Sequence, residues 1–120
     1  MARITILQHS KDAVEVPAGQ VIFNQGDSAT NMYVVTEGQV DIVIDGRVVD
    51  TVAPGESFGE MALIDNRPRS ATAVASVASK VVAVDKARFI FMVTETPNFA
   101  LQIMGIMGDR LRKHNDRAVG

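Results

Sequence analysis

Cysteine is absent from the 120 residues of this chain. A chain without cysteine forms no disulfide, no iron–sulfur cluster and no zinc site built from thiolates. Histidine is scarce as well: His9 and His114 lie near opposite ends, and no HxH or HExxH spacing occurs. The sequence therefore predicts no metal site.

An excess of positive charge and a long apolar run are also missing. The formal net charge is -2 at pH 7 and the pI is about 5.6, whereas a protein that binds nucleic acid over its whole surface is usually basic. No apolar run approaches the roughly 20 residues that cross a bilayer. The start, MARITILQHS, turns polar too soon for a secretory signal. We therefore expect a cytoplasmic chain that binds neither membranes nor, directly, nucleic acid.

In the first two-thirds of the chain, glycines separate short runs that are rich in Val and Ile. Asp45-Gly46 joins two of these runs and is a strong signal for a two-residue hairpin. Many short strands with frequent turns are typical of an antiparallel sandwich or barrel. The predicted strands cover Val14–Val16, Val21–Phe23, Met32–Thr36, Val40–Ile44, Arg47–Val52, Ala71–Val77 and Lys80–Val84.

The last third of the chain has helical spacing instead. One helix is predicted over about 86–96, with Asp85 as its N-cap, and a second over about 97–117. Gly105 and Gly108 inside the second helix either admit a close packing partner or leave the helix soft. One stripe of this second helix carries Phe99, Ile103, Ile106, Met107, Arg110 and His114.

The stretch FGEMALIDNRPRSATA, residues 58 to 73, combines features that suit an anion. Glu60–Ile64 predicts one turn of helix, whose first amide groups lack partners and carry partial positive charge. Gly59 lets a ligand approach the backbone. Arg69 adds a forked donor with a permanent charge that suits phosphate.

Glu60 in the same stretch does not suit a phosphate, because a carboxylate only accepts hydrogen bonds. A ligand with both a phosphate and a neighbouring hydroxyl would use Glu60 and Arg69 together. The alternative is an ordinary corner, in which Glu60 caps its own short helix and Arg69 pairs with Glu60 or Asp65 at the surface.

The stretch closely resembles the phosphate-binding cassette of cyclic nucleotide-binding domains. The matching residues are Phe58, Gly59, Glu60, Ala62, Leu63, Pro68, Arg69, Ser70 and Ala71. Two upstream stretches, from Pro17 to Asp27 and from Met32 to Gly38, resemble the early strands of that family.

The resemblance implies a mainly β fold with C-terminal α-helices: an eight-stranded antiparallel jelly-roll β-barrel over about 13–85, with a lid helix at the C-terminus. Residues 1–120 would form this single domain. Glu60 would accept the ribose 2′-hydroxyl, and Arg69 would pair with the cyclic phosphate. The remaining predicted ligand-binding residues are Phe58, Gly59, Met61, Ala62, Ser70 and Ala71.

The resemblance also implies that the second helix covers the ligand as a lid. The base contacts would then come from Arg110, Arg112, His114 and Asn115. For each of the four, the alternative is a solvated helix end.

These observations predict a regulatory module and not an enzyme. It would bind cAMP, possibly cGMP, and need no cofactor. The alternative is a degenerate jelly-roll that serves dimerisation or an effector protein through the C-terminal helix. A cupin-like metal enzyme would need histidines on strands, and the predicted strands hold none. Helix-turn-helix, kinase, channel and cyclase segments are absent from these residues, so we expect a free-standing sensor or a part of a larger protein.

Overall fold

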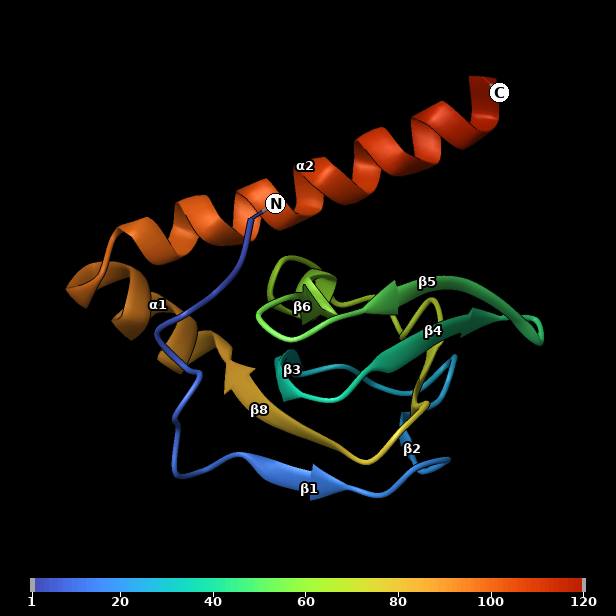
Figure 1. The fold of residues 1–120 in the computed structure, drawn as a ribbon. Helices are drawn as coiled ribbons and strands as arrows, with labels where there is room; N and C mark the ends of the chain where they lie inside the picture. The colour runs from blue at the N-terminus through green and yellow to red at the C-terminus, as the bar shows by residue number, and fades with distance from the viewer. Residues whose placement is uncertain (1, 120) are drawn as a thin grey trace.

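Two four-stranded antiparallel sheets and two C-terminal helices make up the structure, a computed structural model that describes the backbone of residues 2–119 and the side chains of residues 2–115 (Figure 1). One sheet has the order β1 (Val14–Val16), β8 (Ser79–Asp85), β3 (Asn31–Glu37), β6 (Ser57–Phe58). The other has the order β2 (Val21–Phe23), β7 (Thr72–Ala75), β4 (Val40–Ile44), β5 (Arg47–Val52). The predicted jelly-roll architecture is confirmed.

The hairpin between β4 and β5 turns at the predicted dipeptide. Asp45 and Gly46 have φ values of 49° and 80°, and Ile44 pairs with Arg47 across the turn. Positive φ at both central residues gives a turn whose twist matches that of the strands. Predicted strand ends moved by a few residues elsewhere: β3 is longer than Met32–Thr36, and β7 is shorter than Ala71–Val77.

The sheet that contains β3 and β8 is buried on both of its faces. Val35 and Val81 point into the space between the two sheets, whereas Val34 and Val82 point toward the helices. This follows from the alternation of side chains along a strand. The core between the sheets comprises Val16, Val35, Val40, Val52, Phe58, Ala73, Ala75 and Val81.

The helices cover the outer face of that sheet. α1 (Lys86–Glu95) starts at Asp85, whose side chain accepts a hydrogen bond from the Arg88 amide, as predicted. α2 (Asn98–Val119) then crosses the end of the strands (Figure 1). The second core comprises Ile4, Leu7, Met32, Val34, Val82, Val84, Met92, Phe99, Ile103 and Ile106.

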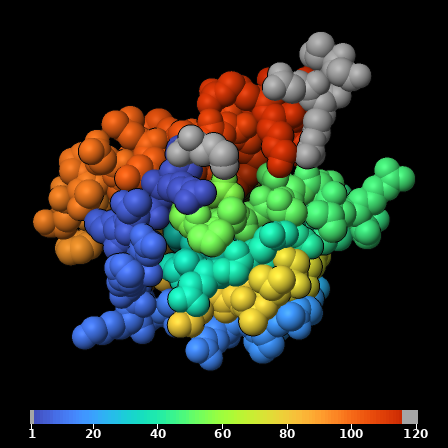
Figure 2. Space-filling view, in the orientation of Figure 1, coloured from blue at the N-terminus to red at the C-terminus, as the bar shows by residue number. Residues whose placement is uncertain are grey.

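The N-terminal segment, residues 2–13, packs between the helices and the strands (Figure 2). Ala2 lies so close to Gly105 that a Cβ on the glycine would be 2.7 Å from the Ala2 Cβ. The Ala2 amide donates to Asp109, and the Ile4 amide donates to the Gly55 carbonyl at 2.6 Å. Gly105 therefore admits a close neighbour, which was one of its two predicted roles.

Among the described residues, no single helix is long and apolar enough to cross a membrane. The two C-terminal helices pass that test only when they are joined, and they are bent by 117°.

Candidate functional site

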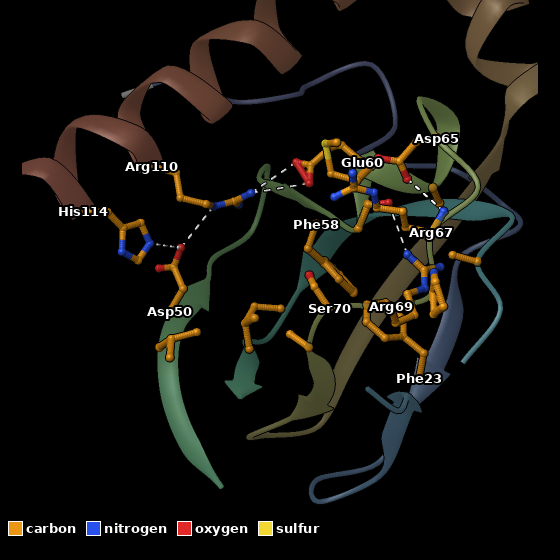
Figure 3. Close-up of a pocket in the computed structure, with 18 residues that line it drawn as sticks. Phe23, Asp50, Phe58, Glu60, Asp65, Arg67, Arg69, Ser70, Arg110 and His114 are labelled. Carbon is orange, nitrogen blue, oxygen red and sulfur yellow. Dashed lines mark hydrogen bonds and ion pairs between the residues drawn. The ribbon is translucent and has the colours of Figure 1, made fainter. Parts of the chain in front are cut away.

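A cavity of about 430 Å³ lies between the cassette, β5 and α2. Figure 3 shows Arg69 and Phe23 at one end and Asp50 and His114 at the other, with Glu60 and Ser70 between them. The predicted site residues that line it are Phe58, Gly59, Glu60, Met61, Ala62, Arg69, Ser70, Ala71, Arg110 and His114. The sequence stretch thus folds into one wall of a real pocket.

The predicted turn of helix is a 3-10 helix, η1, over Glu60–Leu63. It begins at Gly59, whose φ of 75° places it in the left-handed region that glycine adopts readily. Its first internal bond runs from the Ala62 amide to the Gly59 carbonyl, at 3.2 Å. The amides of Glu60 and Met61 come before that bond and lie at the start of the turn, where amides have no helical partner.

Arg69 is held in place by its backbone and by its side chain. Its amide donates to Asp27 O at 2.8 Å, and its carbonyl accepts from the Gly26 amide at 2.8 Å. Nη2 donates to Asn31 O at 2.6 Å, and Nη1 donates to Gly59 O at 3.2 Å. The bonds to Gly26 and Asp27 fix the backbone of Arg69, and the carbonyls of Asn31 and Gly59 fix the orientation of its guanidinium.

The guanidinium of Arg69 also rests on an aromatic platform. Its Cζ lies 3.9 Å from the centre of the Phe23 ring, and 5.8 Å from that of Tyr33. Phe58 stacks on Tyr33 at 5.3 Å between centroids. Such a platform stabilises a cation that lies over the face of an aromatic ring.

Arg69 is a buried cation without a counter-anion among the described residues. Its exposed fraction is 8%, no carboxylate lies within ion-pair distance of it, and its Nε has no hydrogen-bond partner within that part of the chain. Burial lowers the pKa of Arg69, and the neighbouring Tyr33 and Asp27 act in the opposite direction. Buried charges are normally paired, so this arrangement suits an incoming anion.

Glu60 is 7% exposed, and its carboxylate accepts hydrogen bonds from β6 and from α2. Its Oε2 accepts from Ser57 Oγ at 3.0 Å and from Arg110 Nη1 at 3.2 Å. Its Oε1 has one long contact, 3.5 Å to Arg110 Nη1. Glu60 therefore keeps acceptor capacity on Oε1 for a hydroxyl.

The ordinary-corner alternative is not what the structure shows. Gly59 is the N-cap of η1 and has no side-chain cap, so Glu60 does not cap its own helix. Arg69 pairs with neither Glu60 nor Asp65. Asp65 instead accepts from the amide of Arg67 at 3.1 Å.

Only part of the predicted lid lies at the cavity. Arg110 and His114 line it, one helical turn apart. Arg112 pairs with Asp109, its side chain is 71% exposed, and it is not among the lining residues. Asn115 is exposed and does not line the cavity either. Base contacts from these four residues stay a prediction.

Asp50 and Arg67 also line the cavity, and the sequence reasoning missed both. A signal for Asp50 was available, because it lies two positions before the buried Val52 on the same face of β5. Asp50 is 7% exposed and pairs with Arg110, whose Nε lies 3.1 Å from Oδ2. Among the described residues, no group of three or more side chains forms a possible metal site.

The jelly-roll thus contains a cavity whose lining includes a buried cation, Arg69, a buried carboxylate, Glu60, and the start of a short helix, η1. The model of the cyclic nucleotide-binding domain family matches residues 13–96. The chain belongs to this family.

Two curated relatives are similar over most of this chain. A cAMP-dependent protein kinase regulatory subunit from Eremothecium gossypii is 41% identical over 85 residues, which cover 71% of this chain and 19% of that protein. The Pycsar effector protein XpPycTIR from Xanthomonas perforans is 30% identical over 105 residues, which cover 87% of this chain and 35% of the relative. The chain thus spans about a fifth to a third of the length of these relatives.

A solved structure described as "A cyclic-GMP-dependent signalling pathway regulates bacterial phytopathogenesis" is similar over almost the whole chain. The TM-score is 0.69 and the identity is 29%, over 99% of this chain and 97% of that one. This similarity includes α2, which lies beyond the residues that the family model matches.

Proposed function

We propose that the chain binds a 3′,5′-cyclic nucleotide in the cavity, with cAMP as the ligand and cGMP as the alternative. The observation that carries the proposal is Arg69, a buried, oriented guanidinium without a counter-anion in the described part of the chain. Its fork would bind the cyclic phosphate, and the amides at the start of η1 would add donors. Glu60 would accept the ribose 2′-hydroxyl through Oε1.

The choice of cAMP is supported by the relative that is a cAMP-dependent protein kinase regulatory subunit. The alternative is supported by the structural neighbour whose description names cyclic GMP. Ser70 lines the cavity beside Arg69 and offers a hydroxyl to the phosphate of either nucleotide, so it does not separate them.

We further propose that the domain regulates and does not catalyse, and that α2 closes over the base. Arg110 and His114 would meet the base, because they line the end of the cavity that is opposite Arg69 (Figure 3). Ligand contacts that exist only in the closed state would shift the population toward it. The cytoplasmic location and the absence of direct nucleic-acid binding stay predictions.

A second candidate is a module that serves dimerisation or an effector protein without binding a nucleotide. The outward face of α2 favours it, since Leu101, Met104 and Leu111 are 64%, 60% and 63% exposed. Exposed apolar side chains at this spacing suit a second helix. The same face could also report the bound state to a partner.

A calorimetric titration of ligand-stripped protein with cAMP, cGMP and 5′-AMP tests the proposal. We expect Kd values of about 1 µM or tighter for a cyclic nucleotide and much weaker binding of 5′-AMP. The absence of heat with both cyclic nucleotides, together with a stable dimer in size-exclusion chromatography, would favour the second candidate.

A further inference from the structure

Basic side chains of α2 converge on one carboxylate of the β-roll. Arg110 Nε lies 3.1 Å from Asp50 Oδ2, and Lys113 Nζ lies 3.2 Å from Oδ1. His114 Nε2 is 3.9 Å from Oδ2. Figure 3 shows Arg110 and His114 reaching from α2 toward Asp50 at the end of β5. Asp50 is the meeting point of the helix and the strand.

We propose that Asp50 is the positioning residue of α2, a latch that helps to hold the helix over the cavity. The latch itself follows from contacts within the chain. Its consequence for binding rests on the proposed function.

Because Asp50 is buried, its carboxylate depends on α2 for stabilising partners. Its side chain is 7% exposed, and a carboxylate this buried is unfavourable without partners. Within the described residues its one backbone donor is the Thr51 amide, at 2.9 Å, and its charged partners, Arg110 and Lys113, both come from α2. Asp50 therefore obtains its counter-charges only when α2 is docked.

The latch also sets the orientation of Arg110. With Nε on Asp50, the two terminal nitrogens of the planar guanidinium face the cassette. Nη1 then donates to Glu60 Oε2 at 3.2 Å, and Nη2 donates to Ser57 O at 2.6 Å. One side chain thereby ties α2 to β5, β6 and η1 at once.

The latched arrangement leaves the site able to bind. Within the described residues, Glu60 Oε1 has only the 3.5 Å contact with Arg110, so a ribose hydroxyl could still donate to it. Contacts within the chain that favour the docked helix lower the cost of ordering it on binding, and this raises the apparent affinity. Loss of the latch should weaken all cyclic nucleotides by one common factor.

Hydrogen exchange in the nucleotide-free protein tests the latch directly. Asp50→Asn keeps the shape and an acceptor for Thr51 but removes the charge. We expect amides of residues 106–115 to exchange about tenfold faster, with β3 and β8 unchanged. Asp45→Asn is the matched control, because Asp45 is exposed in the hairpin turn, where asparagine is favourable. Equal exchange in the parent and in Asp50→Asn would overturn the proposal.

Lys113→Met is a second variant for the case that Asp50→Asn does not fold. Lys113 is 46% exposed, so its loss leaves the core intact and should speed exchange in 106–115 by about threefold. No change in exchange with this variant and a well-folded parent would count against the latch.

Titrations of the same variants separate the latch from recognition of the base. We expect Asp50→Asn to weaken cAMP and cGMP by the same factor of about ten, so that their order stays that of the parent. A changed order would mean that Asp50 takes part in recognition of the base, directly or through Arg110, and would overturn a role limited to positioning α2. If the parent binds neither nucleotide, the proposed function fails, while the exchange experiment still decides the latch.

Discussion

Arg69 and Gly59 fit against each other without room for a side chain between them. Nη1 of Arg69 donates to the Gly59 carbonyl at 3.2 Å, and a Cβ added to Gly59 would lie 2.6 Å from the same nitrogen. Gly59 also has a φ of 75°. The glycine therefore serves two purposes: it starts η1, and it makes space for the arginine.

A comparison of Gly59→Ala with Gly19→Ala should distinguish the effect of backbone strain from the effect of displacing Arg69. Gly19 has a φ of 85° but nothing within 4 Å of an added Cβ. Each alanine should lower the free energy of unfolding by about 1–2 kcal/mol through backbone strain. Only Gly59→Ala should weaken cyclic nucleotide binding, by about tenfold or more. Denaturant unfolding and calorimetry measure the two effects, and equal affinities of both variants would refute the fit with Arg69.

Glu60→Gln should reduce discrimination between cAMP and 2′-deoxy-cAMP. A hydrogen bond to a carboxylate is roughly twice as strong as one to a neutral amide oxygen. The preference for cAMP should therefore fall by about tenfold, which is about 1.4 kcal/mol. Glu56→Gln is the control, since Glu56 does not line the cavity. Unchanged discrimination in Glu60→Gln would remove Glu60 from the ribose.

Ile4→Ala should show that the N-terminal segment belongs to the core. Ile4 is 2% exposed and packs with the buried residues under α2. Its truncation should cost about 2–5 kcal/mol of unfolding free energy. Ile6 is 48% exposed, so Ile6→Ala should stay within about 0.5 kcal/mol. If both variants unfold like the parent, the segment does not pack as described.

The ion pair between Asp12 and Arg88 predicts a small loss of stability in acid. The hydrogen bond from Arg88, followed by that from Ser10, lowers the pKa of Asp12. A lowered pKa in the folded state stabilises the fold above the unfolded value of about 3.9, and this contribution is lost as the pH falls through the folded value. Both side chains are partly exposed, so the effect is small. Asp12→Asn should flatten thermal stability between pH 5 and pH 3 relative to the parent; identical curves would contradict the pairing.

The cassette could be predicted from the sequence because its determinants are local. Gly59, Glu60 and Arg69 lie within 11 residues, and the turn of helix and the proline between them can be read from the sequence. The contacts of Arg69 with Asp27 and Asn31 are not local and could not be read in this way. The hairpin at Asp45-Gly46 and the cap at Asp85 are local in the same sense, and the structure confirms both.

The contacts at the far end of the cavity could not be predicted in this way. Alternation along β5 places Asp50 on the same face as Val52, but its charged partners come from α2, some 60 residues later. On a helix, Arg110 and His114 share a face, while Arg112 is turned by about 200° from Arg110. The prediction that all four polar residues near the end of this helix contact the base did not take into account which face of the helix each one occupies. The docking of α2 is a tertiary contact, and no local pattern encodes it.

The central claim is that Arg69 receives the phosphate of a cyclic nucleotide. Calorimetric titration of ligand-stripped Arg69→Ala with cAMP tests it most directly, beside the parent and Arg67→Ala. Arg67 also lines the cavity but is exposed, so its loss should cost less than about 1 kcal/mol. Arg69→Ala should lose about 2–5 kcal/mol of binding free energy. Binding by Arg69→Ala that equals the parent's would contradict the account.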